Sequence, residues 1–316
     1  MTVAELAARV RQGELPAVAR AISVVENETA HAGALLAELH PHTGRSTIVG
    51  LTGPPGAGKS TLVDLLAGAW RERGRRVAIV AIDPTSPFTG GALLGDRVRM
   101  QQHAGDPGVF IRSMATRGHL GGLARATGDV VLVLDAAGYD VVIIETVGVG
   151  QDEVDVVRTA DVSIVVVVPG TGDDVQALKA GLMEIADIFV VNKADREGAD
   201  RAVAAIEALL VLQAFAAGAW RPPVLSTEAT KGVGGGALTD TIERFLAQSA
   251  ARMAERRRVR AGLRLEEVLA RRLLAFVEQE VLAPGEFEAL VDRLARRDID
   301  AHAAASALVS RIRQRA

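Results

Sequence analysis

The segment Gly53-Pro-Pro-Gly-Ala-Gly-Lys-Ser60 constrains the fold more than any other part of this 316-residue chain. It has the spacing G-x-x-x-x-G-K-[ST], in which glycines let backbone N–H groups approach phosphate oxygens. The apolar run 47–52 precedes it, and a helical pattern follows it. Strand, loop and helix in this order predict a phosphate-binding loop at the carboxyl end of a parallel strand.

Short apolar runs alternate with helical stretches as far as about Gly236, and this alternation predicts an α/β fold. The runs cover residues 47–52, 77–82, 109–111, 141–144, 162–168, 188–191 and 223–225. Several are β-branched and apolar throughout, as in parallel strands that are covered on both faces. We therefore expect a P-loop domain with a mostly parallel central sheet and helices on both sides.

Helical patterns flank the predicted sheet in the sequence. Residues 2–39 carry apolar positions at helical spacing, and residues 239–316 read as helices that are interrupted at Pro284-Gly285. The predicted organisation is an N-terminal helical extension at 1–45, a P-loop domain at 46–245 and a C-terminal helical arm at 246–316. The apolar positions of the arm must be buried against the main domain, a second copy of the chain or another protein.

Bulk properties exclude several classes of protein. The net charge of −3 is too near balance for a nucleic-acid partner. The chain has no Cys, so it has no disulfide, thiolate metal site or catalytic thiol. No apolar run reaches the roughly 18 residues of a membrane span, and the N-terminus lacks the pattern of a signal peptide. We expect a soluble cytoplasmic protein without a membrane partner.

A second short motif, Asn192-Lys-Ala-Asp195, follows the apolar run 188–191 and predicts which base is bound. The Asp195 carboxylate can accept hydrogen bonds from N1–H and from the 2-amino group of guanine, a pair of donors that adenine lacks. Hydrogen-bond readout of this kind discriminates by about 10⁴–10⁵. Asn192 is expected to contact N7 and the Lys193 stem to pack on the base. A helix N-cap is the alternative interpretation of this motif.

The polar residues of the phosphate loop have expected roles. Lys59 is expected to reach the β- and γ-phosphates and is a catalytic candidate, Ser60 to place its hydroxyl on Mg²⁺, and Thr61 to lie at the α-phosphate. The expected phosphate-binding residues are Pro55, Gly56, Ala57, Gly58, Lys59, Ser60 and Thr61. Together with the base-reading motif, this loop predicts GTP as the ligand.

Three acids and one glycine are further metal or catalytic candidates. Glu145-Thr-Val-Gly148 stands where GTPases read D-x-x-G, so Glu145 is expected to help hold Mg²⁺ and the Gly148 amide to sense the γ-phosphate. Asp83 and Asp96 end a Pro- and Gly-rich loop and are assigned to the metal shell, with turn capping as the alternative. Val149 stands where small signalling GTPases carry the water-positioning Gln, which predicts slow hydrolysis that a partner accelerates.

With these motifs the chain resembles the MeaB/ArgK family, the methylmalonyl-CoA mutase-associated GTPases, from about residue 18 to 245. The matching segments are Gly53–Thr61, Asp83-Pro84, Gly90-Gly91, Leu94–Arg97, Gly121-Gly122, Glu145–Gln151, Gly170–Gly181 and Val191–Asp195. The resemblance implies a GTPase that assists adenosylcobalamin loading and protection of a B12-dependent acyl-CoA mutase, with methylmalonyl-CoA mutase as the default client. It also implies GTP or GDP with Mg²⁺ as ligands, hydrolysis stimulated by the client, and a homodimer formed through the C-terminal arm.

The resemblance assigns roles to two further pairs of residues. Asp173 and Lys179 match charged positions of an additional switch loop at the contact with the client, and a structural salt bridge accounts for the pair equally well. Glu228-Ala229 stands where relatives often carry Ser-Ala, and the Ala229 amide is expected to meet guanine O6. Both residues are therefore expected at the nucleotide.

Three other functions compete with this interpretation. A kinase or ATPase serving basic amino-acid transport predicts a preference for ATP, which Asp195 opposes. A nickel-delivering metallochaperone needs Cys/His clusters, whereas this chain has no Cys and six scattered His. A nucleotide-gated scaffold predicts that a cobalamin-dependent mutase leaves the hydrolysis rate unchanged.

Overall fold

The computed structural model describes residues 1–84, 105–116, 122–146, 159–170, 180–216 and 218–315. The chain divides into two compact units, Met1–Met253 and Ala254–Ala316. None of the helices within the described ranges is long and apolar enough to cross a membrane.

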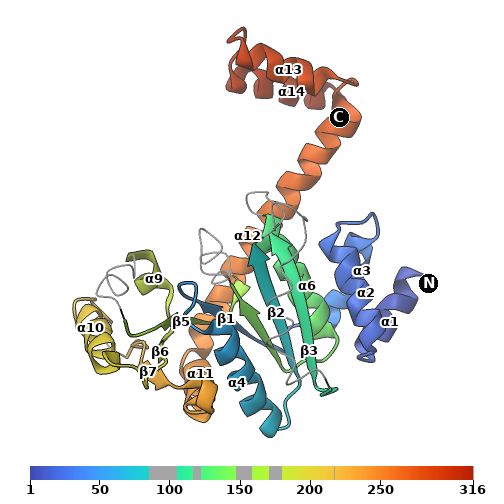
Figure 1. The fold of residues 1–316 in the computed structure, drawn as a ribbon. Coiled ribbons are helices and arrows are strands. Elements are labelled where there is room, and N and C mark those ends of the chain that lie inside the picture. Colours follow the sequence, from blue (N-terminus) through green and yellow to red (C-terminus); the bar gives the residue numbers. More distant parts are fainter. Residues whose placement is uncertain (85–104, 117–121, 147–158, 171–179, 217, 316) are drawn as a thin grey trace. The chain divides into compact units, whose positions relative to one another are not determined.

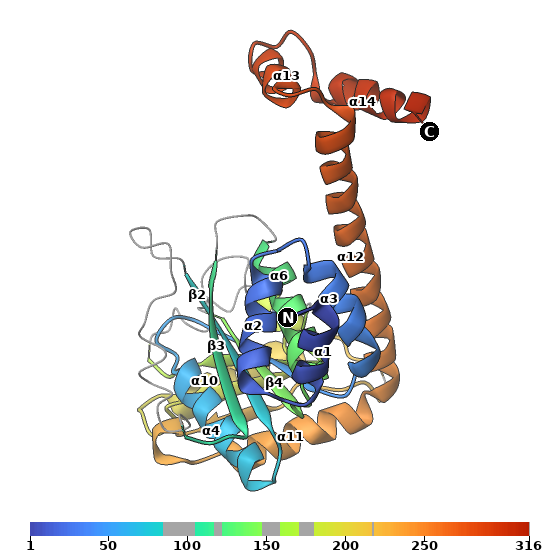
Figure 2. The same cartoon turned by 90° about the vertical axis from the view of Figure 1, so that its right-hand side faces the viewer.

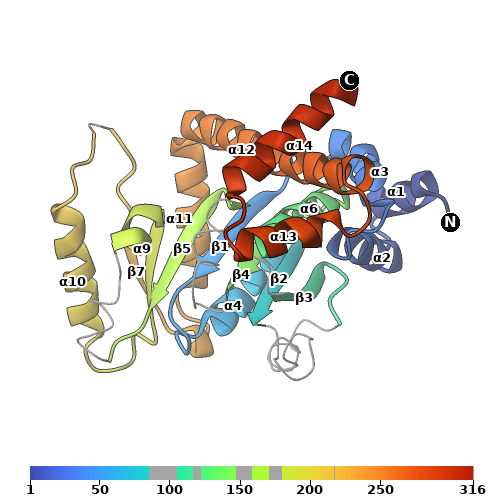
Figure 3. The same ribbon diagram turned by 90° about the horizontal axis from the view of Figure 1, so that it is seen from above.

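A seven-stranded sheet forms the centre of the first unit, and all its described strand pairs are parallel (Figure 1). The strands are β1 (Thr47–Thr52), β2 (Val77–Pro84), β3 (Val109–Thr116), β4 (Val141–Glu145), β5 (Val162–Val167), β6 (Ile188–Asn192) and β7 (Val224–Thr227). They lie in the order β3-β2-β4-β1-β5-β6-β7. Figure 3 shows β3, β2, β4, β1 and β5 following one another across the sheet. The sheet therefore extends from β1 in both directions, and the carboxyl ends of its strands lie along one edge.

All seven predicted strands are confirmed, and the predicted α/β fold is correct. β3 is longer than predicted: the apolar run ends at Ile111, whereas the strand pairs with β2 as far as Thr116 opposite Pro84. The residue directly after that run is Arg112, which forms an ion pair with Glu26. A charged residue on an edge strand interrupts the apolar pattern without interrupting the backbone ladder, so the sequence signal stops early.

Helices cover both faces of the sheet. Those of the first unit are α1 (Val3–Arg11), α2 (Leu15–Glu26), α3 (Ala32–Leu39), η1 (His40–His42), α4 (Lys59–Glu72), α6 (Gly122–Ala136), α9 (Ala180–Ile185), α10 (Ala199–Val211), η3 (Ala229–Lys231), α11 (Gly235–Gln248) and the start of α12 (Ala250–Phe276). α4 and α11 pack on one face, whereas α1–α3 with α6, and separately α10, pack on the other. Figure 2 shows α1–α3 and α6 on the side of β2 and β3 opposite to α4.

The alternation of side chains along the strands explains these layers. In β2, Ala78 and Val80 join the core under α1–α3 and α6, whereas Val77 and Ile79 join the core under α4 and α11. Successive residues of a strand point to opposite faces, so a strand that is apolar throughout needs cover on both. The N-terminal helices provide part of that cover, and Ile22 of α2 is fully buried there.

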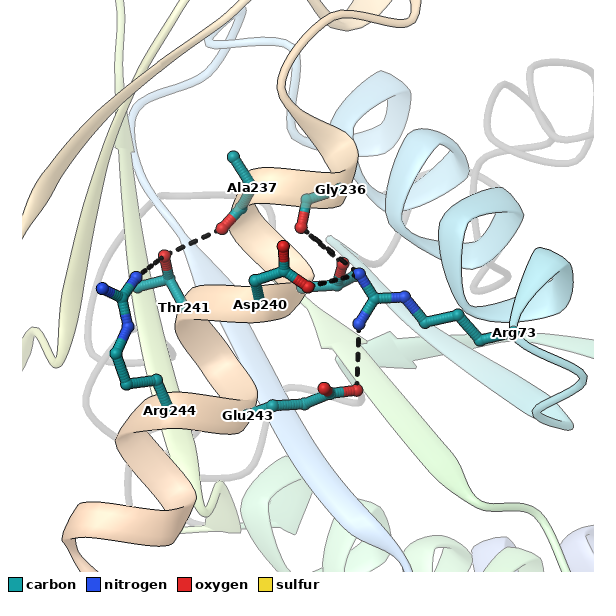
Figure 4. A network of polar contacts seen from close by, with 8 residues as sticks. Arg73, Gly236, Ala237, Asp240, Thr241, Glu243 and Arg244 are labelled. Carbon is teal, nitrogen blue, oxygen red and sulfur yellow. Dashed lines mark hydrogen bonds and ion pairs between the residues drawn. The ribbon is translucent and has the colours of Figure 1, made fainter.

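An arginine at the end of α4 holds α11 beside it (Figure 4). The Arg73 guanidinium donates to the Asp240 carboxylate at 2.6 Å and to the Glu243 carboxylate at 3.1 Å. It also reaches the Gly236 carbonyl oxygen at 3.5 Å. Because α4 follows the phosphate loop and α11 follows the loop after β7, this network helps to hold the two loops at a fixed separation.

The second unit consists of the rest of α12, the π-helical turn η4 (Val277–Val281), α13 (Glu286–Ala295) and α14 (Ala301–Arg315). The predicted interruption at Pro284-Gly285 lies between η4 and α13. Arg311 of α14 connects these elements, since its guanidinium donates to the Glu286 carboxylate and to the Val281 carbonyl oxygen. Many large apolar side chains of this unit are exposed, namely Val259, Leu263, Leu265, Leu269, Leu273, Leu274, Phe276, Phe287, Val291 and Val309.

Two glycines of the phosphate loop differ in what surrounds them. Gly53 (φ 146°) lies against β5, where a Cβ would overlap the Val166 carbonyl oxygen. Gly56 (φ 79°) also has a positive φ, but nothing lies within 4 Å of the position that its Cβ would take. Of these two positions, only Gly53 therefore excludes a side chain by direct contact with the sheet.

We predict that Gly53→Ala lowers the free energy of unfolding by about 3 kcal/mol or more, because the backbone of a central strand cannot move away from the added methyl group. Gly56→Ala is the matched control, since the same methyl group meets only the backbone strain of a positive φ, which costs about 1–2 kcal/mol. Urea unfolding followed by circular dichroism measures both values. Equal losses in the two variants would contradict the close approach at Gly53.

Candidate functional site

The predicted site residues that the structure describes gather at the carboxyl edge of the sheet. β4 ends at Glu145, β6 ends at Asn192, and β7 ends at Thr227, directly before Glu228. The phosphate loop follows β1, which lies between β4 and β5. The parallel arrangement thus brings Asn192 into contact with Ala57, although the two are 135 residues apart in the sequence.

The phosphate loop turns through three glycines with positive φ, Gly53 (146°), Gly56 (79°) and Gly58 (82°). Helix α4 begins at Lys59, and its N-cap is Gly58, which has no side chain to cap the helix. The first N–H groups of an α-helix have no partner within the helix and carry the positive end of its dipole. This end of α4 therefore has the chemistry of an anion site.

Lys59 is buried within this loop. Its Nζ donates to the carbonyl oxygens of Gly53 at 2.8 Å and of Pro54 at 3.1 Å. The ammonium group therefore bridges the start of the loop to the first turn of α4 and adds a full positive charge beside the helix N-terminus. In a partly desolvated site, that charge attracts an anion more strongly than it would in water.

Ser60 and Glu145 connect the phosphate loop to the end of β4. The Ser60 hydroxyl donates to Oε1 of Glu145 at 2.6 Å, and Glu145 is buried. The next residue, Thr146, is held by its N–H to the Leu51 carbonyl oxygen at 3.1 Å. A hydroxyl and a carboxylate oxygen thus converge beside the anion site, and such hard oxygen donors are the ligands that Mg²⁺ prefers.

The buried Asn192 side chain connects three loops of the site. Its Nδ2 donates to the Ala57 carbonyl oxygen at 3.0 Å and approaches that of Gly58 at 3.5 Å. Its Oδ1 accepts from the Thr227 hydroxyl at 3.0 Å and from the Ala229 N–H at 3.3 Å. One amide therefore links the phosphate loop to the loop after β7, and it also ties Ala229, a predicted base contact, to the same cluster.

Lys193 and Ala194 continue this connection. Lys193 Nζ donates to the Gly56 carbonyl oxygen at 2.7 Å, so its stem reaches over to the phosphate loop. Its backbone has φ 58°, a left-handed conformation that is uncommon for residues other than glycine. The Ala194 N–H donates to the Thr227 carbonyl oxygen at 3.0 Å. The base-reading motif is thus attached to the loops on both of its sides.

Asp195 forms an ion pair with a residue outside the predicted site. Its Oδ2 lies 3.4 Å from Nζ of Lys231, and the same ammonium group donates to Oε2 of Glu228 at 2.7 Å. Hydrogen bonds to Glu228 and then to Asp195 raise the pKa of Lys231 above its ordinary value, so the group stays charged. Lys231 follows Glu228 by three residues, and such a spacing brings two side chains together in a helical turn. This spacing is the sequence signal from which the contact between Lys231 and Glu228 could have been predicted.

A cavity of about 520 Å³ lies beside these loops, between α4 and the loop after β7. Thr61 and Asp64 line it from α4, and Ala229 and Gly232 line it from the loop. Thr61 was predicted at the α-phosphate and Ala229 at the base, and the rest of the lining continues along α4 as far as Glu72, away from the phosphate loop.

Five predicted site residues are not placed in full. Gly148, Asp96, Asp173 and Lys179 lie outside the described residues. For Asp83 only the backbone is described: it lies in β2, two residues after Ala81, which pairs with Glu145 of β4. The roles assigned to these residues stay predictions.

The chain is similar to known proteins over most of its length. The family described as "Methylmalonyl Co-A mutase-associated GTPase MeaB" matches residues 18–281. A protein of Pyrococcus abyssi that is provisionally named a GTPase is 51% identical over 312 residues, which cover 98% of this chain and 96% of that protein. The GTPase ArgK of Escherichia coli is 41% identical over 235 residues, which cover 72% of this chain and 71% of that protein.

One solved structure is similar to this chain. It is described as a LAO/AO transport system kinase, with a TM-score of 0.71 and 28% sequence identity. The superposition covers 99% of this chain and 98% of that one. From the family match and these relatives, the chain belongs to the MeaB family of methylmalonyl-CoA mutase-associated GTPases.

Proposed function

We propose that this protein binds GTP and GDP together with Mg²⁺, hydrolyses GTP slowly by itself, and uses hydrolysis to assist a client enzyme. The client is an adenosylcobalamin-dependent acyl-CoA mutase, with methylmalonyl-CoA mutase as the first candidate. The protein would assist loading of the cobalamin cofactor and protect the loaded mutase. The observation that carries the nucleotide part is the Asn192 bridge, which connects the anion site to the two loops expected at the base.

Phosphate binding follows from the loop between β1 and α4. Glycine backbone and the N-terminus of α4 supply N–H donors, and Lys59 supplies the charge. When a triphosphate binds, Lys59 Nζ would exchange its hydrogen bonds to the Gly53 and Pro54 carbonyl oxygens for bonds to the phosphates. Ser60 and Thr61 would lie beside the phosphates. These residues bind and orient the phosphates, which is the main protein contribution to phosphoryl transfer.

Guanine selection follows from the loops after β6 and β7. Asp195 would accept from N1–H and the 2-amino group, and the Lys193 stem would cover the base. Asn192 would meet N7, while the Ala229 amide would meet O6 and Glu228 would border the pocket. An adenine in the same position lacks both donors, so it would not form the hydrogen bonds to Asp195 that favour guanine.

The donor set at Ser60 and Glu145 fits Mg²⁺. A hydroxyl and a carboxylate oxygen lie 2.6 Å apart at the edge of the anion site, and both are hard oxygen ligands. Asp83 and Asp96 would complete the shell. When bound, Mg²⁺ would neutralise charge on the phosphates. The residues themselves would hold the phosphates in line, with Gly148 near the γ-phosphate.

Slow intrinsic hydrolysis follows from Val149, which cannot orient a water molecule as a Gln side chain does. A client that supplies or orders the missing group would then set the rate. Asp173 and Lys179 are the residues that we assign to the contact with the client. The family description, which names methylmalonyl-CoA mutase, supports this choice of partner.

The helical arm supports a homodimer. Its α12 exposes Leu265, Leu269 and Leu273 at spacings of four residues, and further apolar side chains of the unit are exposed beside them in the sequence. Such a density of exposed apolar residues is typical of an interaction surface. A second copy of the arm is the occupant that we propose.

A role as a kinase in basic amino-acid transport is the alternative, and the solved structure of the same fold is described as a kinase of a transport system. The residues expected at the base do not favour it. Asp195 discriminates against adenine for the reason given above, so a preference for ATP would need a different reading of this pocket.

We predict that Lys59→Ala reduces affinity for GDP and GTP at least about a hundredfold, because removal of a desolvated charge facing phosphates costs about 3 kcal/mol. Isothermal titration calorimetry measures the affinity. Arg9→Ala is the control, since it removes one positive charge from α1, far along the chain from the loop. Nucleotide affinity that is unchanged in Lys59→Ala would contradict the assignment of the loop.

We predict that Asp195→Asn shifts the preference from guanosine to xanthosine nucleotides by about 10³-fold or more, because the amide can donate to the xanthine O2 and no longer accepts two hydrogen bonds from guanine. Competition of GDP, XDP and ADP against a fluorescent nucleotide measures the ratio. Guanine selectivity that survives this substitution would show that another group reads the base.

We predict that an adenosylcobalamin-dependent methylmalonyl-CoA mutase raises kcat for GTP hydrolysis at least about tenfold, because it supplies what Val149 does not. Phosphate release with and without the mutase measures the effect. Lys59→Ala with the mutase is the control for contaminating hydrolysis. The same turnover with and without the mutase would favour the nucleotide-gated scaffold.

We predict that Leu269→Glu with Leu273→Glu converts a dimer to a monomer, because two charges would enter an apolar interface without partners. Arg257→Glu is the matched control, since it changes the net charge by the same amount from an exposed position on another side of α12. Light scattering after gel filtration distinguishes 33.1 kDa from twice that mass. A wild-type protein of 33.1 kDa would overturn the homodimer.

A further inference from the structure

We propose that Lys231 is an internal counter-ion of the base-reading carboxylate: it occupies Asp195 while no guanine is bound, and Glu228 retains it when guanine arrives. Lys231 would thereby set guanine affinity without belonging to the phosphate site. This inference rests on the proposed guanine-binding function of Asp195. It gives the loop after β7 a role in setting guanine affinity, which neither the phosphate loop nor the motif Asn192–Asp195 predicts.

The geometry of the three charged groups carries the inference. Lys231 Nζ lies 2.7 Å from Oε2 of Glu228 and 3.4 Å from Oδ2 of Asp195, so the ammonium is shared unequally between two carboxylates. The Glu228 side chain is 27% exposed, that of Asp195 40% and that of Lys231 57%. The contact with Asp195 is thus the longer and more solvated of the two, and it is the one that a ligand can replace at lower cost.

The loop holds Lys231 close to Glu228. The two residues lie at the ends of one tight turn, in which the Lys231 N–H donates to the Glu228 carbonyl oxygen at 2.8 Å. Glu228 also pairs with Val233 in an antiparallel bridge that closes the turn, and Gly232 permits it with φ 76°. Asp195 comes from a different strand end. Lys231 therefore moves with Glu228, whereas its contact with Asp195 depends on what fills the pocket.

Competition at Asp195 follows from its hydrogen-bonding capacity. Guanine presents two donors side by side, N1–H and the 2-amino group, and needs both carboxylate oxygens in one orientation. An ammonium at Oδ2 occupies one of those oxygens. Binding of guanine therefore has to displace the contact between Lys231 and Asp195, while the shorter contact with Glu228 keeps the ammonium satisfied.

Two substitutions then have opposite effects. Removal of the ammonium in Lys231→Met frees Asp195, so GDP affinity rises. Removal of the Glu228 charge in Glu228→Gln leaves Asp195 as the only carboxylate partner of Lys231 within the described part of the chain, so competition strengthens and GDP affinity falls. Simple attraction of the anionic diphosphate predicts the reverse order, because it favours positive charge and disfavours negative charge near the site.

The test is GDP titration of the full-length wild type, Lys231→Met, Glu228→Gln and the double variant by calorimetry. Exposed ion pairs contribute little, so we expect about two- to fivefold tighter binding for Lys231→Met and about two- to fivefold weaker binding for Glu228→Gln. The double variant is expected to match Lys231→Met, because Glu228 acts only through the lysine. Lys231→Arg is expected to retain the wild-type affinity.

The pair formed by Arg9 of α1 and Glu14 at the N-cap of α2 offers matched controls, Arg9→Met and Glu14→Gln, which change the same charges and are expected to leave GDP affinity unchanged. If Lys231 only stabilises the turn, both Lys231→Met and Glu228→Gln weaken GDP binding and lower the Tm together, which overturns the inference. Unchanged affinity in both variants also overturns it, while the guanine site stands if Asp195→Asn still loses GDP. A wild type that binds no guanine nucleotide overturns the proposed function and this inference together.

Discussion

The hydrogen bonds of the Asn192 side chain are the interactions on which the rest of the site depends. The side chain is buried at the end of β6, and it donates to the phosphate loop at Ala57 while it accepts from Thr227 and from the Ala229 N–H. Loss of this amide would leave buried polar groups without partners on two loops, and each such group costs about 1–3 kcal/mol. The anion site and the base-reading loops therefore keep one relative position, which is what recognition of a whole nucleotide requires.

The parallel sheet makes that position possible. β1 lies between β4 and β5, so Ser60 meets Glu145 on one side and Ala57 meets Asn192 on the other. Helix α4 follows the phosphate loop, and Arg73 at its end pairs with two carboxylates of α11. Because α11 follows the loop after β7, these pairs help to fix the position of that loop. The residues that we assign to phosphate binding and to base selection thus belong to one network of hydrogen bonds. The charged groups at its rim, Asp195 with Lys231 and Glu228, are the more exposed part of the site.

Much of the fold could be predicted because its signals are local. Several strands that are covered on both faces are apolar throughout, and all seven strands were predicted. The prediction stopped early in β3, where Arg112 pairs with Glu26 of α2 and breaks the apolar pattern. Helical periodicity identified the N-terminal helices, yet it shows only which side chains are apolar. It does not show that Ile22 packs in a core shared with β2.

The sequence by itself determined the phosphate loop, its place after a strand and before a helix, and the motif of Asn192 to Asp195. Those features depend on backbone freedom at glycines and on short spacings, which are visible in the chain itself. Only the tertiary structure decided that Asn192 donates to Ala57, that Ser60 donates to Glu145, and that Asp195 and Glu228 share the ammonium group of Lys231. Most of these contacts join segments from different strand ends, and a contact between distant segments leaves no local pattern in a single sequence.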